Sequence, residues 1–163
     1  MFGKAGAGKN FVAGIFEREF GYYFYDADQD LTPEMIDAIN KNQRFSNKMR
    51  DRYFAIVKIK LKKLLETENK VVLTQGLFKN KHRFDLLKEF PFARFIWVDA
   101  DQSILESRIL ARNNFITKEY ARKINSYFEE PEFVCSKIMN NEGEPEILLQ
   151  IGSFHLFYTC GKM

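Results

Sequence analysis

The chain opens with a glycine-rich loop, Gly3-Lys4-Ala5-Gly6-Ala7-Gly8-Lys9-Asn10. It matches the pattern G-x-x-x-x-G-K-[S/T] at every fixed position except the last, where Asn10 replaces a hydroxyl residue. Small residues let successive main-chain N–H groups curl around a phosphate, and Lys9 adds a mobile cation. A chance glycine turn is the alternative. The helical pattern after the loop favours a phosphate site, because a helix directs its positive end at the same anion.

Two features of this loop depart from the usual arrangement. A hydroxyl normally ligates Mg²⁺ at the last position, and the carboxamide of Asn10 is longer, so we expect weaker or water-mediated Mg²⁺ binding, or loss of activity. Only Met1 and Phe2 precede the loop, where a buried central strand of about five residues is usual. We therefore expect either that the gene starts upstream or that the sheet has a truncated middle strand and reduced stability.

Composition limits the class of protein. A chain of 163 residues and 19.2 kDa predicts one domain over residues 1–163. Hydrophobic residues make up 45% and charged residues 29%, which is typical of a globular protein, and no apolar run is long enough to span a membrane. The net charge of +3 fits an anionic ligand without favouring nucleic acid. Two cysteines and no secretory leader lead us to expect a cytoplasmic protein, of undetermined oligomeric state.

Strands and helices alternate along the rest of the chain. We expect helices over about 10–20, 33–42, 47–68, 81–90, 101–112, 117–129 and 144–158. We expect strands over 22–25, 71–74, 94–98 and 133–139. Strands separated by helices pair in parallel, with ligands beyond their carboxyl ends. The predicted fold is α/β with three layers, a parallel sheet of about five strands and helices on both faces.

Helical periodicity also predicts which side chains share a face. In the first helix these are Phe11, Ile15 and Phe16. In the long third helix the predicted buried face consists of Phe54, Val57, Leu61, Leu64 and Leu65. Ser46 and Thr32 are predicted to cap the helices that follow them.

Four further motifs are candidates for the site, two of them directly after predicted strands and two on predicted helices. Asp26-Ala27-Asp28 follows the first strand, and Gly76 follows the second. Arg50 lies at the start of the long helix, while Arg108 and Arg112 are four residues apart and so share one helix face. A solvated turn or an ordinary helix surface is the alternative for each of them.

Together the loop and these motifs resemble the small P-loop kinases of the nucleoside-monophosphate-kinase-like group, especially shikimate kinase and gluconate kinase. The resemblance extends from Gly3 to about Gly143. It implies ATP-dependent transfer of the γ-phosphoryl group to a hydroxyl of a small metabolite, a sugar acid or a shikimate-like acid. It also implies a helical lid over about 108–130, ATP binding by residues 3–10, and a catalytic role for Lys9.

The resemblance assigns roles to the carboxylates. Asp26, together with Asn10, would help to hold Mg²⁺. Asp28 would be catalytic and contact the substrate, orienting the acceptor hydroxyl or accepting its proton.

It also assigns roles on the substrate and phosphate sides. Arg50, with Arg52 as the alternative, would bind an acidic substrate, and Gly76 would let the substrate approach the backbone. Arg108 and Arg112 would bind ATP and act in catalysis by closing over its phosphates. The turn 140–143 resembles the loop that borders the adenine in this group.

The predicted acceptor pocket departs from both named kinases. Leu31-Thr32-Pro33 lacks the histidine of gluconate kinases, and no glycine triplet of the shikimate kinase kind surrounds Gly76. Two other functions therefore stay open. One is an ATP-binding protein without catalysis, because of Asn10 and the short first strand. The other is a kinase for nucleosides, nucleotides or polynucleotide ends, with a base-stacking pocket around the helix that contains Tyr53.

Overall fold

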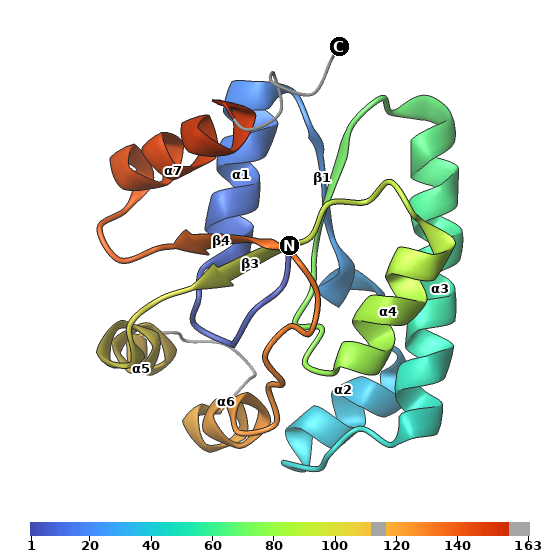
Figure 1. The fold of residues 1–163 in the computed structure, drawn as a ribbon. Coiled ribbons are helices and arrows are strands. Elements are labelled where there is room, and N and C mark those ends of the chain that lie inside the picture. The colour runs from blue at the N-terminus through green and yellow to red at the C-terminus, as the bar shows by residue number, and fades with distance from the viewer. Residues whose placement is uncertain (112–116, 157–163) are drawn as a thin grey trace.

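The structure, a computed structural model, describes residues 1–111 and 117–156. Its strands form two parallel pairs. β1 (Tyr23–Asp26) pairs with β2 (Val71–Thr74), and β3 (Ile96–Asp99) pairs with β4 (Ser136–Met139). The helices surround these pairs (Figure 1).

Met1 and Phe2 join the two pairs into one sheet. The amino group of Met1 donates to the Leu73 carbonyl at 2.6 Å, while Phe2 N–H donates to the Ile96 carbonyl at 2.9 Å. The Val98 N–H group returns a bond to the Phe2 carbonyl at 2.8 Å. The predicted parallel α/β sheet is therefore confirmed, but the described residues contain four strands in place of about five, and Phe2 links the two pairs through an isolated bridge to Trp97. The N-terminus lies at the centre of this arrangement (Figure 1).

Helices cover both faces of this sheet, which confirms the three-layer prediction. On one face α1 (Lys9–Phe20) and α7 (Glu144–Leu156) lie side by side, and α5 (Gln102–Ala111) packs into the same apolar core through Leu105. On the other face are α2 (Pro33–Asn40), α3 (Asn47–Thr67) and α4 (Asn80–Glu89), which enclose a second core. α6 (Lys118–Asn125) lies beside α5 (Figure 1).

The two predicted caps are confirmed. The Thr32 hydroxyl accepts a bond from Met35 N–H at 3.3 Å, and the Ser46 hydroxyl accepts one from Met49 N–H at 3.2 Å. Each cap satisfies a helix N–H group that has no partner within its own helix.

Two predicted faces are wrong in part. Phe11 is 49% exposed because α1 turns Val12, Ala13, Ile15 and Phe16 toward the sheet instead. Leu65 is 46% exposed, whereas Tyr53, Phe54 and Val57 of α3 are buried in the second core and Leu64 packs against it, half-buried.

A cavity of about 630 Å³ lies beside Met1. Among its lining residues are Val71 and Leu73 of β2, Ile96 of β3 and Leu65. In a parallel ladder the N–H and C=O of one residue point to the same side, so the N–H groups of Leu73 and Ile96 face the line along which Met1 and Phe2 run. The cavity therefore continues the direction of the short middle strand.

The amino group of Met1 is buried in this arrangement. Desolvation, and secondly the charge of Lys9, lower its pKa from 8.0 to about 5. The folded protein therefore holds this amine neutral at pH 7.

Candidate functional site

The glycine-rich loop curls at the amino end of α1. Gly8 precedes the helix with φ of +81°, in the left-handed region that glycine adopts without strain, and no side chain caps the helix there. The Lys9 ammonium group donates to the carbonyls of Gly3 at 3.2 Å and Lys4 at 3.1 Å, across the mouth of the loop. An uncapped helix terminus and a cation on one concave backbone are suited to an anion.

Arg108 reaches this loop from α5. Asn140, buried after β4, donates to the Ala7 carbonyl at 2.9 Å and accepts a long bond from Arg108 at 3.4 Å. The other terminal nitrogen of Arg108, Nη1, is buried and has no hydrogen-bond partner among the described residues. A Cβ atom at Gly8 would lie 3.7 Å from this nitrogen and 2.3 Å from the Asn140 amide. An unpaired guanidinium nitrogen beside the loop fits a phosphate oxygen as its partner.

The two residues predicted to hold Mg²⁺ lie in contact. The Asn10 amide donates to the Asp26 carboxylate at 2.6 Å, and the other Asp26 oxygen accepts from Asp28 N–H at 3.1 Å. The described residues contain no group of three or more His, Cys, Asp or Glu side chains arranged to hold a metal. Asn10 and Asp26 nevertheless offer hard oxygen donors next to the phosphate loop. This fits Mg²⁺, which takes one or two protein oxygens and completes its shell with phosphate and water.

Asp28 lies in a short turn that is fastened on both sides. This turn, η1 (Ala27–Asp30), accepts a bond from the Tyr53 hydroxyl at the Ala27 carbonyl, 2.7 Å away. Asp30 accepts bonds from Tyr25 at 2.6 Å and Lys60 at 2.8 Å. Burial opposes ionisation of Asp30, but these two donors outweigh it and lower its pKa. Asp30 is therefore a structural anchor and not a freely solvated acid, and the turn presents Asp28 in a fixed place.

A cavity of about 110 Å³ is lined by Lys9 and Asp28. Arg50 lines it as well, and desolvation, followed by the nearby charge of Arg44, lowers the pKa of the Arg50 guanidinium. Most of the remaining wall is apolar or aromatic: Leu31, Met35, Ile39, Phe45, Tyr53, Phe54, Leu77, Phe78, Tyr120, Ile124 and Tyr127. Gly76 also lines the cavity, but the Phe78 ring fills the space that a side chain at Gly76 would take, with a ring carbon 2.3 Å from the Cβ position.

A sequence profile of one family matches residues 5–146, which is most of the chain: the shikimate kinase family. The chain belongs to the shikimate kinase family. A comparison with curated proteins gives no match.

Solved structures of similar fold extend this kinship. A sugar kinase from Janibacter, unliganded, has a TM-score of 0.79 and 19% identity over 96% of this chain and 91% of its own. A gluconokinase from Sinorhizobium meliloti has a TM-score of 0.77 and 19% identity, over 99% and 95%. A deoxyadenosine kinase from M. mycoides with bound dATP has a TM-score of 0.62 and 17% identity, over 94% and 97%. At these identities the likeness is one of fold, and it confirms the P-loop kinase architecture.

The structure of this shikimate kinase family member gathers the predicted site residues at one end of the sheet. Lys9, Asp28, Arg50 and Gly76 line one cavity, Asn10 and Asp26 are bonded beside it, and Arg108 lies over the loop. Arg112 falls outside the described residues. Their roles stay predictions, since their positions alone do not test them.

Two asparagines that contact the loop were missed. Asn140 was considered only as part of a turn near the adenine, although its place at the carboxyl end of β4 is where α/β proteins bind ligands. Asn125, at the end of α6, bonds to Ala5 from 120 residues away, and no local pattern marks it. Within the described residues, no helix has the length and apolar character needed to cross a membrane.

Gly8 should be intolerant of substitution. We predict that Gly8→Ala lowers the free energy of unfolding by about 2 kcal/mol, because the left-handed backbone disfavours a side chain and Asn140 must move. Gly14→Ala is the matched control within α1, since no atom lies within 4 Å of its Cβ position, and it should be neutral or up to about 1 kcal/mol stabilising. Urea unfolding compares them, and equal stability of the two variants would contradict the prediction.

Proposed function

We propose that this protein transfers the γ-phosphoryl group of ATP to a hydroxyl group of a small acidic metabolite. The observation that carries the proposal is one continuous cavity, lined by the phosphate-loop cation Lys9, by Asp28 and by the desolvated Arg50. Phosphoryl transfer needs a bound phosphate chain, a positioned hydroxyl and stabilisation of charge, and these residues can supply all three.

The phosphate side of the reaction would be handled by the loop. Its main-chain N–H groups and the amino end of α1 would hold the phosphates, while Lys9 and Arg108 would stabilise the charge on the transferring group. Mg²⁺, when bound, would neutralise phosphate charge, and Asn10 and Asp26 are the residues that would hold it.

The acceptor would lie in the adjoining cavity. Asp28 would accept a hydrogen bond from its hydroxyl and orient it toward the γ-phosphate, or take its proton. Arg50 would pair with its carboxylate, which compensates the desolvation of the guanidinium. The largely aromatic wall offers few other polar partners, so a ring-bearing, shikimate-like acid fits better than an open-chain sugar acid with many hydroxyls to satisfy.

A second function is favoured by the same wall. The rings of Phe45, Tyr53, Phe78, Tyr120 and Tyr127 all line the cavity, and planar bases stack on such rings. A nucleoside would therefore be the acceptor in this second function, with its base in the stacking pocket that the sequence predicts around the helix containing Tyr53. The third possibility, ATP binding without catalysis, rests on Asn10 and is distinguished by turnover.

Loss of Lys9 should abolish turnover without unfolding the protein. We expect Lys9→Ala to lower Mg²⁺-dependent ATP turnover by at least about 100-fold, because one charge on the transferring group is lost. Asp28→Asn should lower kcat by about 10²- to 10⁴-fold. Lys62→Ala is the control, since this exposed lysine pairs with Glu89 far from the cavity. Full activity of Lys9→Ala would contradict the assignment, and ATP binding without turnover for every acceptor would support the non-catalytic function.

Arg50 separates an acidic acceptor from a nucleoside. For a hydroxylated carboxylic acid, we expect Arg50→Met to raise KM by about 10- to 100-fold, the value of one charge-assisted hydrogen bond. Arg52→Met is the control, because Arg52 is exposed, pairs with Glu34 and is not among the described residues that line the cavity. An acceptor screen that includes free nucleosides completes the test. Phosphorylation of a neutral nucleoside with a KM insensitive to Arg50→Met would favour the second function.

A further inference from the structure

Residues 125–130 lead from α6 back toward the sheet, and we call them the connector. One end is fastened to the phosphate loop by Asn125. Its side-chain amide donates to the Ala5 carbonyl at 3.0 Å, and its oxygen accepts from Ala5 N–H at 2.7 Å. Two opposed bonds to the main chain of one residue resemble the pairing between strands, so they fix both the distance and the orientation of Ala5.

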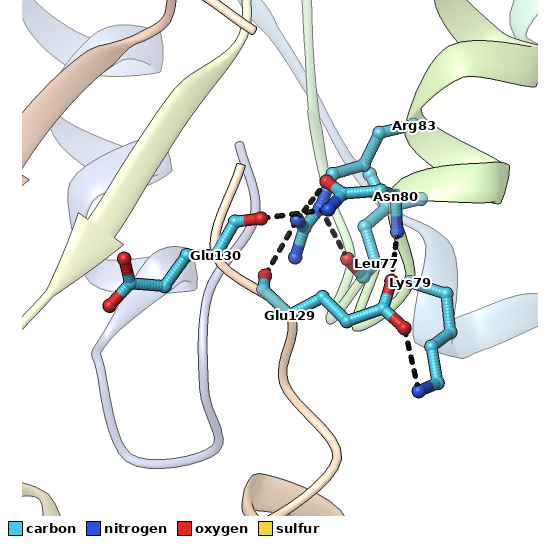
Figure 2. A network of polar contacts seen from close by, with 6 residues as sticks. All are labelled: Leu77, Lys79, Asn80, Arg83, Glu129 and Glu130. Carbon is cyan, nitrogen blue, oxygen red and sulfur yellow. Dashed lines mark hydrogen bonds and ion pairs between the residues drawn. The ribbon is translucent and has the colours of Figure 1, made fainter. Parts of the chain in front are cut away.

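The other end of the connector is fastened to the loop that follows β2, residues 75–79, which we call the acceptor loop. Glu129 N–H donates to the Phe78 carbonyl at 2.9 Å. The Glu129 carboxylate accepts from Lys79 at 2.9 Å and from Asn80 N–H at 2.7 Å, where it caps the amino end of α4. The Asn80 side chain donates in turn to the Glu130 carbonyl at 2.8 Å (Figure 2).

Arg83 holds these two segments together from within. It is fully buried, and its guanidinium donates to the Leu77 carbonyl at 2.7 Å through Nε and to the Glu129 carbonyl at 2.7 Å through Nη1 (Figure 2). The rings of Phe2 and Phe128 lie 4.5 Å and 4.8 Å from it. Leu77, whose carbonyl accepts the bond from Nε of Arg83, has φ of +45°. This left-handed conformation is costly for a leucine, so it must be stabilised by surrounding contacts.

Only a few residues therefore separate a contact to the phosphate loop from a contact to the acceptor loop. We propose that the connector mechanically couples the two loops, with Asn125 and Arg83 as positioning residues that set the acceptor loop according to the state of the phosphate loop. The benefit of this coupling rests on the proposed function: in a kinase, it would align the acceptor only when the nucleotide is bound.

A direct contact between the two loops also exists. Gly3 N–H donates to the Gly76 carbonyl, but at 3.4 Å this bond is long. The connector offers shorter bonds and a buried cation, so it should carry most of the coupling.

Amide hydrogen exchange on the ligand-free protein tests this coupling. For each variant, exchange is measured in the loop at the other end of the connector from the substitution. Asn125→Ala should speed exchange at Leu77 and Asn80 about tenfold, although it removes a contact to Ala5. Arg83→Lys keeps the charge but cannot bridge two carbonyls with a fixed fork, and it should speed exchange at Ala5 and Ala7 about tenfold. Lys123→Ala is the matched control on α6, because it loses only a bond to the Asn42 carbonyl and should leave both loops unchanged.

The outcomes are separable. Exchange that changes only next to each substitution, or that rises equally in the control and in all helices, would overturn the proposal. Titration with MgADP is a separate measurement on the same proteins. If MgADP fails to bind the unsubstituted protein, the proposed function fails, whereas the ligand-free exchange rates still decide whether the connector couples the loops.

Discussion

Met1 and Phe2 are the residues on which the site depends, because their main chain holds the two halves of the sheet together. Bonds to β2 on one side and β3 on the other fix where the glycine-rich loop begins. The Phe2 ring is fully buried, and the Arg83 guanidinium packs over it at 4.5 Å. One short segment therefore positions the phosphate loop directly and the acceptor loop through Arg83.

Two arginines near the site each keep one buried nitrogen without a hydrogen-bond partner among the described residues. Arg83 is fully buried, makes three hydrogen bonds through Nε and Nη1, and packs near the rings of Phe2 and Phe128, while its Nη2 has no partner. Arg108 is half-buried and makes one long bond to Asn140. The two differ in their surroundings: Arg83 is enclosed by protein, whereas Nη1 of Arg108 lies beside the phosphate loop, where an anion would be its partner.

Local patterns in the sequence were sufficient for the fold class and for the position of the glycine-rich loop at the start of a helix. The glycine spacing predicted the loop, and Thr32 and Ser46 predicted helix starts, because each of these signals acts within a few residues. Phe11 and Leu65 were assigned wrongly because periodicity does not say which apolar stripe faces the sheet or how far a helix overlies it. The contacts of Asn125, Asn140 and Arg83 were not predicted, because their partners lie 120, 133 and 46 residues away in the sequence. Such contacts become visible only when the tertiary fold is known.

The cavity beside Met1 has a consequence for how firmly the sheet is packed. Its apolar lining includes Val71 and Leu73 of β2 as well as Ile96 of β3, so a single apolar group lying there would contact both halves of the sheet at once. Filling this space would therefore tie the two halves together by side-chain packing, in addition to the main-chain bonds of Met1 and Phe2.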